Sequence, residues 1–316
     1  MKTPIAKRLD TDIAVAIATL GLLAAATLPA MAVVTAPPTL SISRDGNNVT
    51  ITVKGAPLAA YSFCSSLTGE RTGTWNQLTT VTANASGTAS FTDGVNTQVA
   101  QQFYAVVQGA NGTIGQPISL GATNIFSLNV VGYVNVVCPP GFSLIANQLN
   151  AATNTLSSLI PATADGTTFF FYHTGTGYSA YVYDALEPGW TPNASGELLA
   201  PGGGAFVKNT TTSNLTFTFV GEVMQGSLTN ICPAGFAIRS SKIPAAESLN
   251  TMKFPANDGD SVFVYNNLTG YSAYVYDSLD QGWTPGNISG PTIIVGQSFF
   301  TFQQSAKTWV RNFTVQ

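Results

Sequence analysis

Residues 176–192 read "TGYSAYVYDALEPGWTP" and residues 269–285 read "TGYSAYVYDSLDQGWTP". The first nine residues of the two stretches are identical, and both stretches close on the same Gly-Trp-Thr-Pro. In an extended chain the side chains alternate, so Tyr178 falls on one face while Tyr181 and Tyr183 fall on the other. A strand repeated with aromatic residues on both faces predicts either a repeated scaffold or a repeated binding surface.

The two stretches belong to a longer duplication. "GYVNVVCPPGFSLIANQL" from Gly132 is matched by "GSLTNICPAGFAIRSSKI" from Gly226, and "PGGGAFVKN" is later matched by "VGQSFFTFQ". The order of the blocks is kept while their spacing varies slightly, as loops allow. We therefore expect two copies, at residues 126–219 and 220–316. Their period is longer than the 20 to 50 residues of common solenoids, so each copy is either a small domain or half of a shared one.

Residues 36–108 read as short alternating runs separated by turn residues. "TLSIS" and "NVTITVKG" flank "RDGNN", a hairpin signal with Asp45 and Gly46 at the turn. The later runs, such as "QQFYAVVQ", are rich in β-branched and aromatic residues. This spacing predicts a small antiparallel sandwich, followed by a Gly-rich linker at 109–125. Because helical spacing is confined to "LNAATNTLSSLI", we expect an all-β protein with one or two helical turns.

The first 32 residues have the pattern of an export signal. Basic residues near the start precede an uncharged apolar run at 13–28, and Ala30-Met31-Ala32 offers a cleavage site. Cleavage after Ala32 is the favoured interpretation, and an uncleaved membrane anchor is the alternative. No later stretch approaches the roughly 18 apolar residues of a spanning helix, so we expect no membrane span after cleavage. The predicted location is secreted or cell-surface, with the periplasm also open.

Charge and cysteine content narrow the classes of partner and site. Only 9% of residues are charged and the net charge is −3, which argues against a nucleic-acid partner. Three cysteines follow the signal: Cys64, Cys138 and Cys232. Cys138 and Cys232 are equivalent in the two copies, and a disulfide between them would need their Cα atoms to lie within about 7 Å. Two small buried hydrophobic side chains are the favoured alternative.

The order of motifs resembles a known arrangement. "GFSLIANQL", "FFYHTGTGYSAYVYD", "GWTP" and "PGGGAFVKN" follow one another as in a β-rich repeat that recurs in exported proteins of environmental Gram-negative bacteria. Residues 36–108 resemble immunoglobulin-like or fibronectin-III-like modules through their opening hairpin, Trp75 and "FYAVV". The resemblance implies a module followed by two repeats in an exported protein. That repeat has no assigned chemistry, so the resemblance implies no mechanism.

Motifs for catalysis are scarce. His173 is the only histidine of the chain, and its counterpart in the second copy is Asn266. An exposed hairpin residue is therefore favoured over a catalytic base. Zinc spacing is lacking, and "PGGGAF" at 201–206 lacks the Lys-Ser/Thr ending of a phosphate-binding loop. We expect no cofactor, no metal and no catalytic residue.

Paired carboxylates are the remaining option for hydrolysis. Asp184 with Glu187 is matched by Asp277 with Asp280, and two carboxylates are enough to cleave a glycosidic bond. Their place beside turn glycines favours local hydrogen bonds to backbone N–H groups instead. "NDGD" at 257–260 is likewise interpreted as a turn and not as a calcium site.

Aromatic side chains are the best candidates for a ligand or interaction surface. Flat rings with polar tips suit stacking on sugars or a protein interface, although filling the core is the favoured alternative. The candidates are Tyr181, Tyr183, Trp190, Tyr274, Tyr276 and Trp283. We therefore expect an exported, non-enzymatic structural or adhesion protein whose partner is another cell-surface protein. A carbohydrate-binding module that recognises polysaccharide is the alternative, and a secreted hydrolase is a more distant one.

Overall fold

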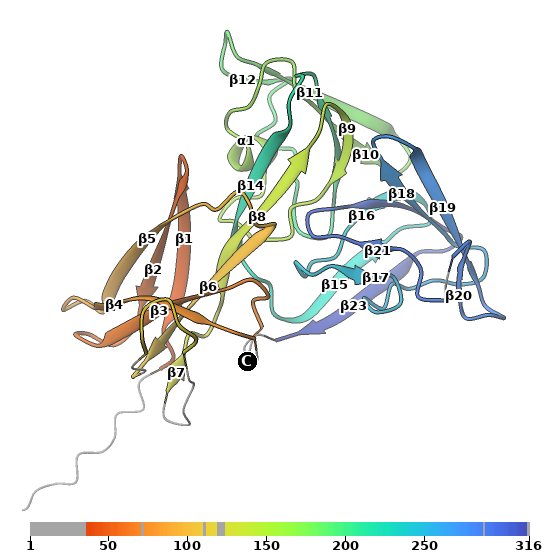
Figure 1. Ribbon diagram of the computed structural model, residues 1–316. Coiled ribbons are helices and arrows are strands. Elements are labelled where there is room, and N and C mark those ends of the chain that lie inside the picture. The colour runs from red at the N-terminus through yellow and green to blue at the C-terminus, as the bar shows by residue number, and fades with distance from the viewer. Residues whose placement is uncertain (1–35, 71–72, 110–111, 119–123, 287, 315–316) are drawn as a thin grey trace, which may run out of the picture. The chain divides into compact units, whose positions relative to one another are not determined.

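The computed structural model describes residues 36–70, 73–109, 112–118, 124–286 and 288–314 (Figure 1). The predicted export signal at 1–32 lies outside these residues. Residues from Pro37 onward form one compact unit, which is described below. Among the described residues its elements are strands apart from one short helix, α1 (Leu156–Leu159), and the paired strands are antiparallel, so the all-β prediction is confirmed. No helix in the described ranges has the length and apolar character needed to cross a membrane.

The N-terminal module is a sandwich of two sheets. The predicted hairpin forms with Asp45 opposite Asn48, and Gly46 between them has a positive φ of 55°. Val49, Ile51 and Val53 alternate toward the core, where they meet the second sheet. The first sheet contains β1 (Thr39–Asp45), β2 (Asn48–Lys54) and β5 (Thr88–Gly94), and the module supplies β3 (Ala60–Ser66), β4 (Asn76–Thr82) and β6 (Gln101–Gln108) to the second.

The second sheet of the module continues into the first copy. Its strand order is β4-β3-β6-β8-β14, with β8 (Val131–Cys138) and β14 (Leu215–Glu222) coming from the first copy. The first half of β6 pairs with β8, from Gln101 opposite Val134 to Tyr104 opposite Val131. The end of β6 pairs with the short β7 (Ile125–Phe126). The module and the first copy are therefore joined by backbone hydrogen bonds as well as by the chain.

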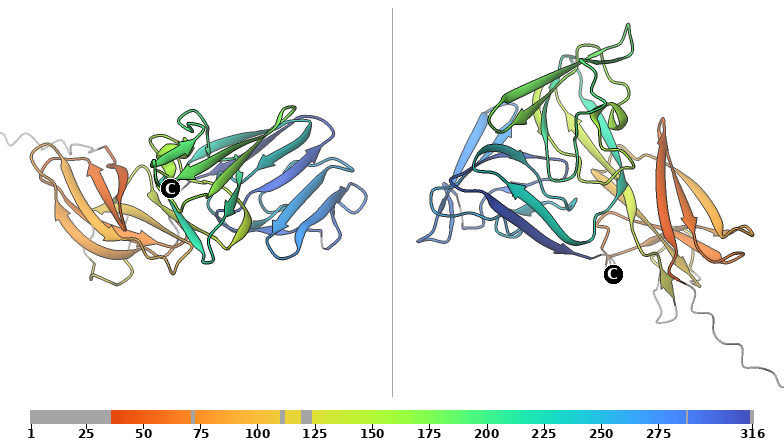
Figure 2. Two further views of the ribbon diagram at one scale, coloured as in Figure 1. Left: turned by 90° about the horizontal axis from the view of Figure 1, so that it is seen from above. Right: turned by 180° about the vertical axis from the view of Figure 1, so that it is seen from behind.

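The two copies share one topology (Figures 1 and 2). Each has a five-stranded sheet and a two-strand ribbon, and the predicted hairpins form with His173 opposite Gly177 and Asn266 opposite Gly270. The five-stranded sheets run β12-β11-β10-β13-β9 and β20-β19-β18-β22-β16, and the ribbons are β14-β8 and β23-β15. Bounds in the first copy are β9 (Gly141–Ile145), β10 (Thr168–His173), β11 (Gly177–Asp184), β12 (Gly189–Thr191) and β13 (Ala205–Asn209). Those in the second are β15 (Gly226–Cys232), β16 (Gly235–Arg239), β18 (Ser261–Asn266), β19 (Gly270–Asp277), β20 (Gly282–Thr284), β22 (Phe299–Gln303) and β23 (Lys307–Phe313). The second copy also has a pair of two-residue strands, β17 (Glu247–Ser248) and β21 (Thr292–Ile293).

Equivalent backbone groups of the two copies bond each other reciprocally. The Ala146 N–H donates to the Gly296 carbonyl at 2.8 Å, and its counterpart, the Ser240 N–H, donates to the Gly202 carbonyl at 3.1 Å. Such exchange of equivalent contacts is the pattern of an isologous interface with two-fold symmetry. The two copies therefore pack as an internal pseudo-dimer.

The hairpin tips repeat this pattern. Thr174, at the β10–β11 turn, donates from its hydroxyl to the Phe236 carbonyl at 3.0 Å. Asn267, at the β18–β19 turn, donates from its amide to the Pro140 carbonyl at 2.7 Å. Each repeated hairpin therefore contacts the opposite copy next to the turn that links the ribbon to the five-stranded sheet.

Candidate functional surface

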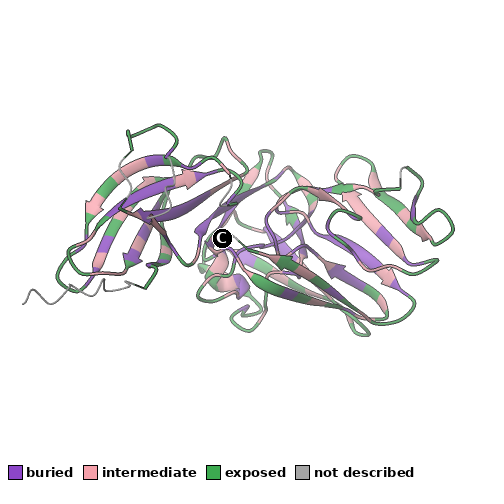
Figure 3. Cartoon of the chain, turned by 90° about the horizontal axis from the view of Figure 1, so that it is seen from below, coloured by how far each residue is buried: buried purple, intermediate pink, exposed green. Residues whose placement is uncertain are grey.

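Residues of the repeated strands β11 and β19 alternate between an inner and an outer face. Figure 3 shows the burial of each described residue along the chain. On the outer face, the side chains of Tyr178 and Tyr271 are 52% and 50% exposed. On the inner face, Tyr183 is 4% exposed, and Tyr181 is partly buried against the core of the first copy. The side of β11 that carries Tyr178 is therefore the more exposed of its two sides.

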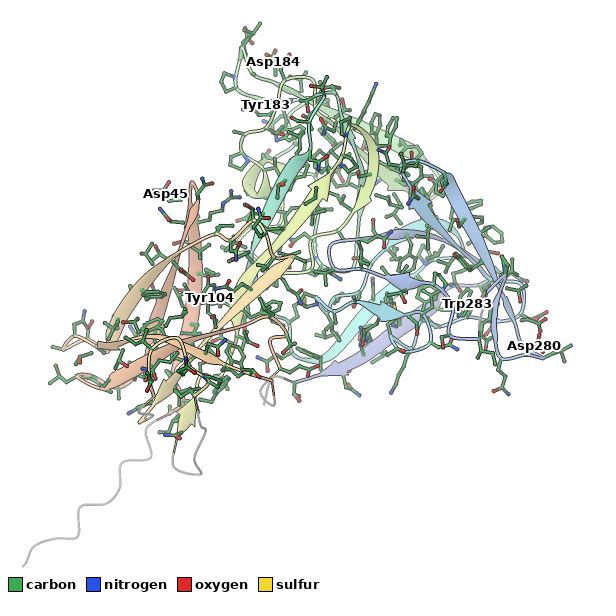
Figure 4. All side chains as sticks on the ribbon, in the orientation of Figure 1. Asp45, Tyr104, Tyr183, Asp184, Asp280 and Trp283 are labelled. Carbon is green, nitrogen blue, oxygen red and sulfur yellow. The ribbon has the colours of Figure 1, made fainter. Side chains whose placement is uncertain are left out.

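The inner face forms the same ring pair in both copies. Tyr183 packs on Trp190 with ring centroids 5.4 Å apart, and Tyr276 packs on Trp283 at the same separation. Figure 4 shows Tyr183 near the end of β11 and Trp283 in the second copy. The indole N–H groups are bound as well, Trp190 to the Ile160 carbonyl at 2.8 Å and Trp283 to a side-chain oxygen at 3.1 Å.

Burial removes three of the six predicted aromatic residues from the candidate ligand surface. Tyr183, Trp190 and Trp283 are buried, so they belong to the hydrophobic cores and are not displayed to solvent. The other three candidates, Tyr181, Tyr274 and Tyr276, are only partly exposed. The aromatic rings most open to solvent in the repeated strands are instead those of Tyr178 and Tyr271, at the third position of each quoted stretch.

The outer faces of the two five-stranded sheets meet in what we call the aromatic interface. Phe206 and Phe300 lie at its centre, each 7% exposed, with ring centroids 6.1 Å apart. Tyr172 packs edge-on against Phe300 at 5.3 Å, and the equivalent Tyr265 packs against Phe206 at 5.1 Å. The full set is Tyr172, Tyr178 and Phe206 from the first copy and Tyr265, Tyr271 and Phe300 from the second.

The two half-exposed tyrosines of the aromatic interface are held by ring contacts. Tyr178 lies 6.4 Å from Phe300, and Tyr271 lies 6.3 Å from Phe206. Burial raises the pKa of both phenols, and the neighbouring Tyr178 hydroxyl raises the pKa of Tyr271 further. Both phenols are therefore uncharged at neutral pH and can donate and accept hydrogen bonds.

A polar cluster beneath β11 distinguishes the first copy from the second. His173 Nε2 lies 2.9 Å from the Ser179 hydroxyl and 3.7 Å from Glu197 Oε2, and the Tyr181 hydroxyl donates to that same oxygen at 2.8 Å. A proton relay needs the acid at the ring nitrogen opposite the serine, whereas here both approach Nε2. The hydrogen bond to Glu197 raises the pKa of Tyr181.

Glu197 is the member of this cluster that sequence reasoning did not select. It lies in the loop after β12, and alignment of "NASGELL" with "NISGPTI" places Pro291 at the equivalent position. Because His173 is likewise replaced by Asn266, the cluster is not repeated. Duplication, the strongest signal in this sequence, therefore gave no indication of it.

The paired carboxylates lie in turns, as predicted. Asp184 accepts the backbone N–H groups of Leu186 and Glu187, at 2.8 and 3.2 Å. In the second copy, Asp277 accepts those of residues 279 and 280 at 2.8 and 3.4 Å. Figure 4 shows Asp184 and Asp280 at the outer ends of their copies. Within the described ranges, no three His, Cys, Asp or Glu side chains lie close enough together to hold a metal ion.

All three cysteines are buried free thiols. Burial raises the pKa of Cys64 and of Cys138 to about 12, and that of Cys232 to about 11. Cys138 and Cys232 end the equivalent strands β8 and β15, and each packs in the core of its own copy. They therefore fill equivalent core positions as small apolar side chains, and no disulfide joins them.

Comparison of the sequence with models of protein families, and separately with curated proteins, finds no match. The function is therefore inferred from the geometry described above.

Proposed function

We propose that this chain is an exported, non-enzymatic structural or adhesion protein of the cell surface or extracellular space. The reciprocal aromatic interface carries the proposal. The repeated strand contributes Tyr183 and Tyr276 to ring pairs inside the copies, and Tyr178 and Tyr271 to the contact between them. Identity between the copies thus follows from two packing requirements on opposite faces of one strand.

The chemistry of the remaining surface agrees with a scaffold. Aromatic pairs of this geometry contribute about 0.5–1.5 kcal/mol each beyond their buried area, so the reciprocal contacts favour one fixed arrangement of the copies. Charged residues make up only 9% of the chain. The exposed face of β15 and β23 carries Ser, Thr and Asn side chains together with Ile231 and Val310, and no exposed charged residue. Such a neutral surface suits contact with another cell-surface component.

Carbohydrate binding is the second candidate, and one observation favours it. Tyr178 and Tyr271 are both half-exposed, lie on adjoining copies and pack against the same central phenylalanine, Phe300, at 6.4 and 6.1 Å. Two such rings with polar hydroxyl tips could stack on successive sugars of a polysaccharide. The polysaccharide would then be recognised on the outer face of β11 and β19.

Binding to insoluble polysaccharides separates the two functions. The purified chain, a Tyr178→Ala/Tyr271→Ala variant and a Tyr181→Ala/Tyr274→Ala variant are each mixed with cellulose, chitin and xylan, and the unbound fraction is measured. The structural or adhesion proposal predicts no binding beyond that of an inert control protein. Micromolar binding that the outer-face variant loses while it keeps its circular dichroism spectrum would overturn the proposal in favour of carbohydrate recognition.

A further inference from the structure

Strand β15 lacks a neighbour that its counterpart β8 has. In the first copy, β8 pairs with β14 on one side and with β6 of the N-terminal module on the other. In the second copy, β15 pairs with β23, and in the part of the chain that the structure describes its other side has no strand. The same ribbon is therefore extended in one copy and open in the other.

The register of β8 shows which backbone N–H and C=O groups of β15 point toward its open side. In β8 the Asn135 N–H donates to the Ala100 carbonyl at 2.8 Å, so odd-numbered residues face β6. Gly132 of β8 corresponds to Gly226 of β15, so odd-numbered residues of β8 correspond to odd-numbered residues of β15. The backbone groups of Ser227 and Thr229 therefore point away from β23. The carbonyl of Ile231 also points outward, since it accepts from Arg239 Nε at 2.6 Å. Within the described ranges, no backbone hydrogen bond is formed by the outward groups of Ser227 and Thr229.

The Arg239 side chain caps the open edge of β15 at the Ile231 carbonyl, while the part of the edge from Gly226 to Thr229 lacks the usual protection against pairing. Natural edge strands are commonly blocked by charged residues, especially Lys, or by Pro. "GSLTNIC" has neither, whereas its partner β23 carries Lys307 and Arg311. Ser227 and Thr229 are exposed, and the space around the Cα of Gly226 is open to at least 4 Å from an added Cβ. A second strand could therefore approach this edge.

We propose that β15 pairs antiparallel with β15 of a second copy of this chain. The result is a four-stranded sheet in the order β23-β15-β15-β23 around a two-fold axis. Two observations favour a second copy of this chain as the partner. The equivalent edge of β8 pairs with a strand of this same chain. In addition, β15 carries no charged residue that would require an oppositely charged partner. This inference goes beyond the proposed function and does not depend on the aromatic interface.

Two-fold pairing satisfies the side chains as well as the backbone. Leu228 faces the core side of its ribbon and is 6% exposed, while Ser227 and Thr229 face solvent. An axis perpendicular to the sheet keeps these faces on the same sides in both copies. Short hydroxyl side chains then lie opposite one another, a favourable cross-strand pairing. Because the contact is isologous and uses the β15 edge of both copies, the assembly closes as a dimer and does not grow into a fibre.

The test is sedimentation velocity of the purified full chain over micromolar to submillimolar concentrations. Three proteins are compared: the unaltered chain, Thr229→Pro and Val310→Pro. Thr229 and Val310 are cross-strand neighbours, both are exposed, and each N–H points away from the ribbon. Proline removes that N–H on the β15 edge in one variant and on the β23 edge in the other.

The proposal predicts a concentration-dependent dimer for the unaltered chain and for Val310→Pro, and a monomer for Thr229→Pro. A monomer throughout for the unaltered chain overturns it, as does a dimer of Thr229→Pro or loss of the dimer in both variants. If Thr229→Pro loses its circular dichroism spectrum, Thr229→Lys replaces it, with Val310→Lys as the control. Like charges near the two-fold axis must then weaken the dimer at least tenfold in the first and leave it unchanged in the second.

Discussion

The buried thiols of Cys138 and Cys232 have raised pKa values that can be tested by measuring stability against pH. The thiols of Cys138 and Cys232 are fully shielded from solvent, and burial raises their pKa to about 12 and about 11. Positive charge on Arg239 and Lys307 offsets part of this effect at Cys232. Cys138, where burial is opposed by a hydrogen bond to Ser143 and by no charged neighbour, is the cleaner of the two for a test.

The raised thiol pKa predicts that stability falls at alkaline pH. Above its ordinary pKa of 9.0 the Cys138 thiol ionises in the unfolded chain but stays protonated in the folded one, until about pH 12. The unfolded state then binds fewer protons, so the free energy of unfolding decreases as pH rises. One such group contributes a slope of up to about 1.4 kcal/mol per pH unit. Urea unfolding between pH 9 and 11 should show a shallower slope for Cys138→Ala.

Val136→Ala is the matched control for that measurement. Val136 is buried on the same strand but does not titrate, so its loss should lower stability at every pH and leave the slope unchanged. An unaltered slope in Cys138→Ala, or an equal change of slope in both variants, contradicts the assignment of the alkaline effect to this thiol.

At the scale of the element, one alternation along β11 separates two roles. Tyr183 lies on the inner face against Trp190, and Tyr178 lies on the outer face at the edge of the aromatic interface. Truncation of a buried aromatic residue typically costs about 3–5 kcal/mol, whereas a half-exposed ring loses much less buried area. The inner position should therefore dominate the stability of the hairpin.

Tyr183→Ala should lower the free energy of unfolding by about 3–5 kcal/mol, and Tyr178→Ala by about 1–2 kcal/mol. Chemical denaturation of the two variants measures this difference. Tyr276→Ala and Tyr271→Ala repeat the comparison in the second copy, where the ring pair has the same separation. If the outer-face variants are the more damaging in either copy, the assignment of the two faces is reversed.

The strands themselves were predictable, while their two faces were not. Alternation, turn glycines and duplication located both hairpins and the turn role of Asp184. Alternation states which residues share a face, but it contains no information about which face is covered. In β11 both faces carry aromatic residues, so hydrophobicity could not decide between Tyr178 and Tyr183. The positions of Trp190 and of the second copy show that Tyr183 lies on the inner face and Tyr178 on the outer face.

At the scale of the whole molecule, the sequence patterns could not predict which strands distant in the sequence pair with each other. The pairing of β6 with β8 joins the module to the first copy, and nothing in "QQFY" or "VGYV" names the other as its partner. The duplication did predict two equivalent units, and the choice between separate and shared domains stayed open. The reciprocal bonds of Ala146 and Ser240 show that each copy completes the contacts of the other.

The central claim is that the aromatic interface, with Phe206 of β13 and Phe300 of β22 at its centre, holds the two copies together. It is tested most directly by a double-mutant cycle between Phe206→Leu and Phe300→Leu, whose rings lie 6.1 Å apart on different copies. A control cycle pairs Phe206→Leu with Phe254→Leu, since Phe254 packs in the core of the second copy. Urea unfolding should give a coupling of about 0.5–1.5 kcal/mol in the first cycle and additivity within about 0.5 kcal/mol in the control. Additive effects of Phe206 and Phe300 would contradict the claim.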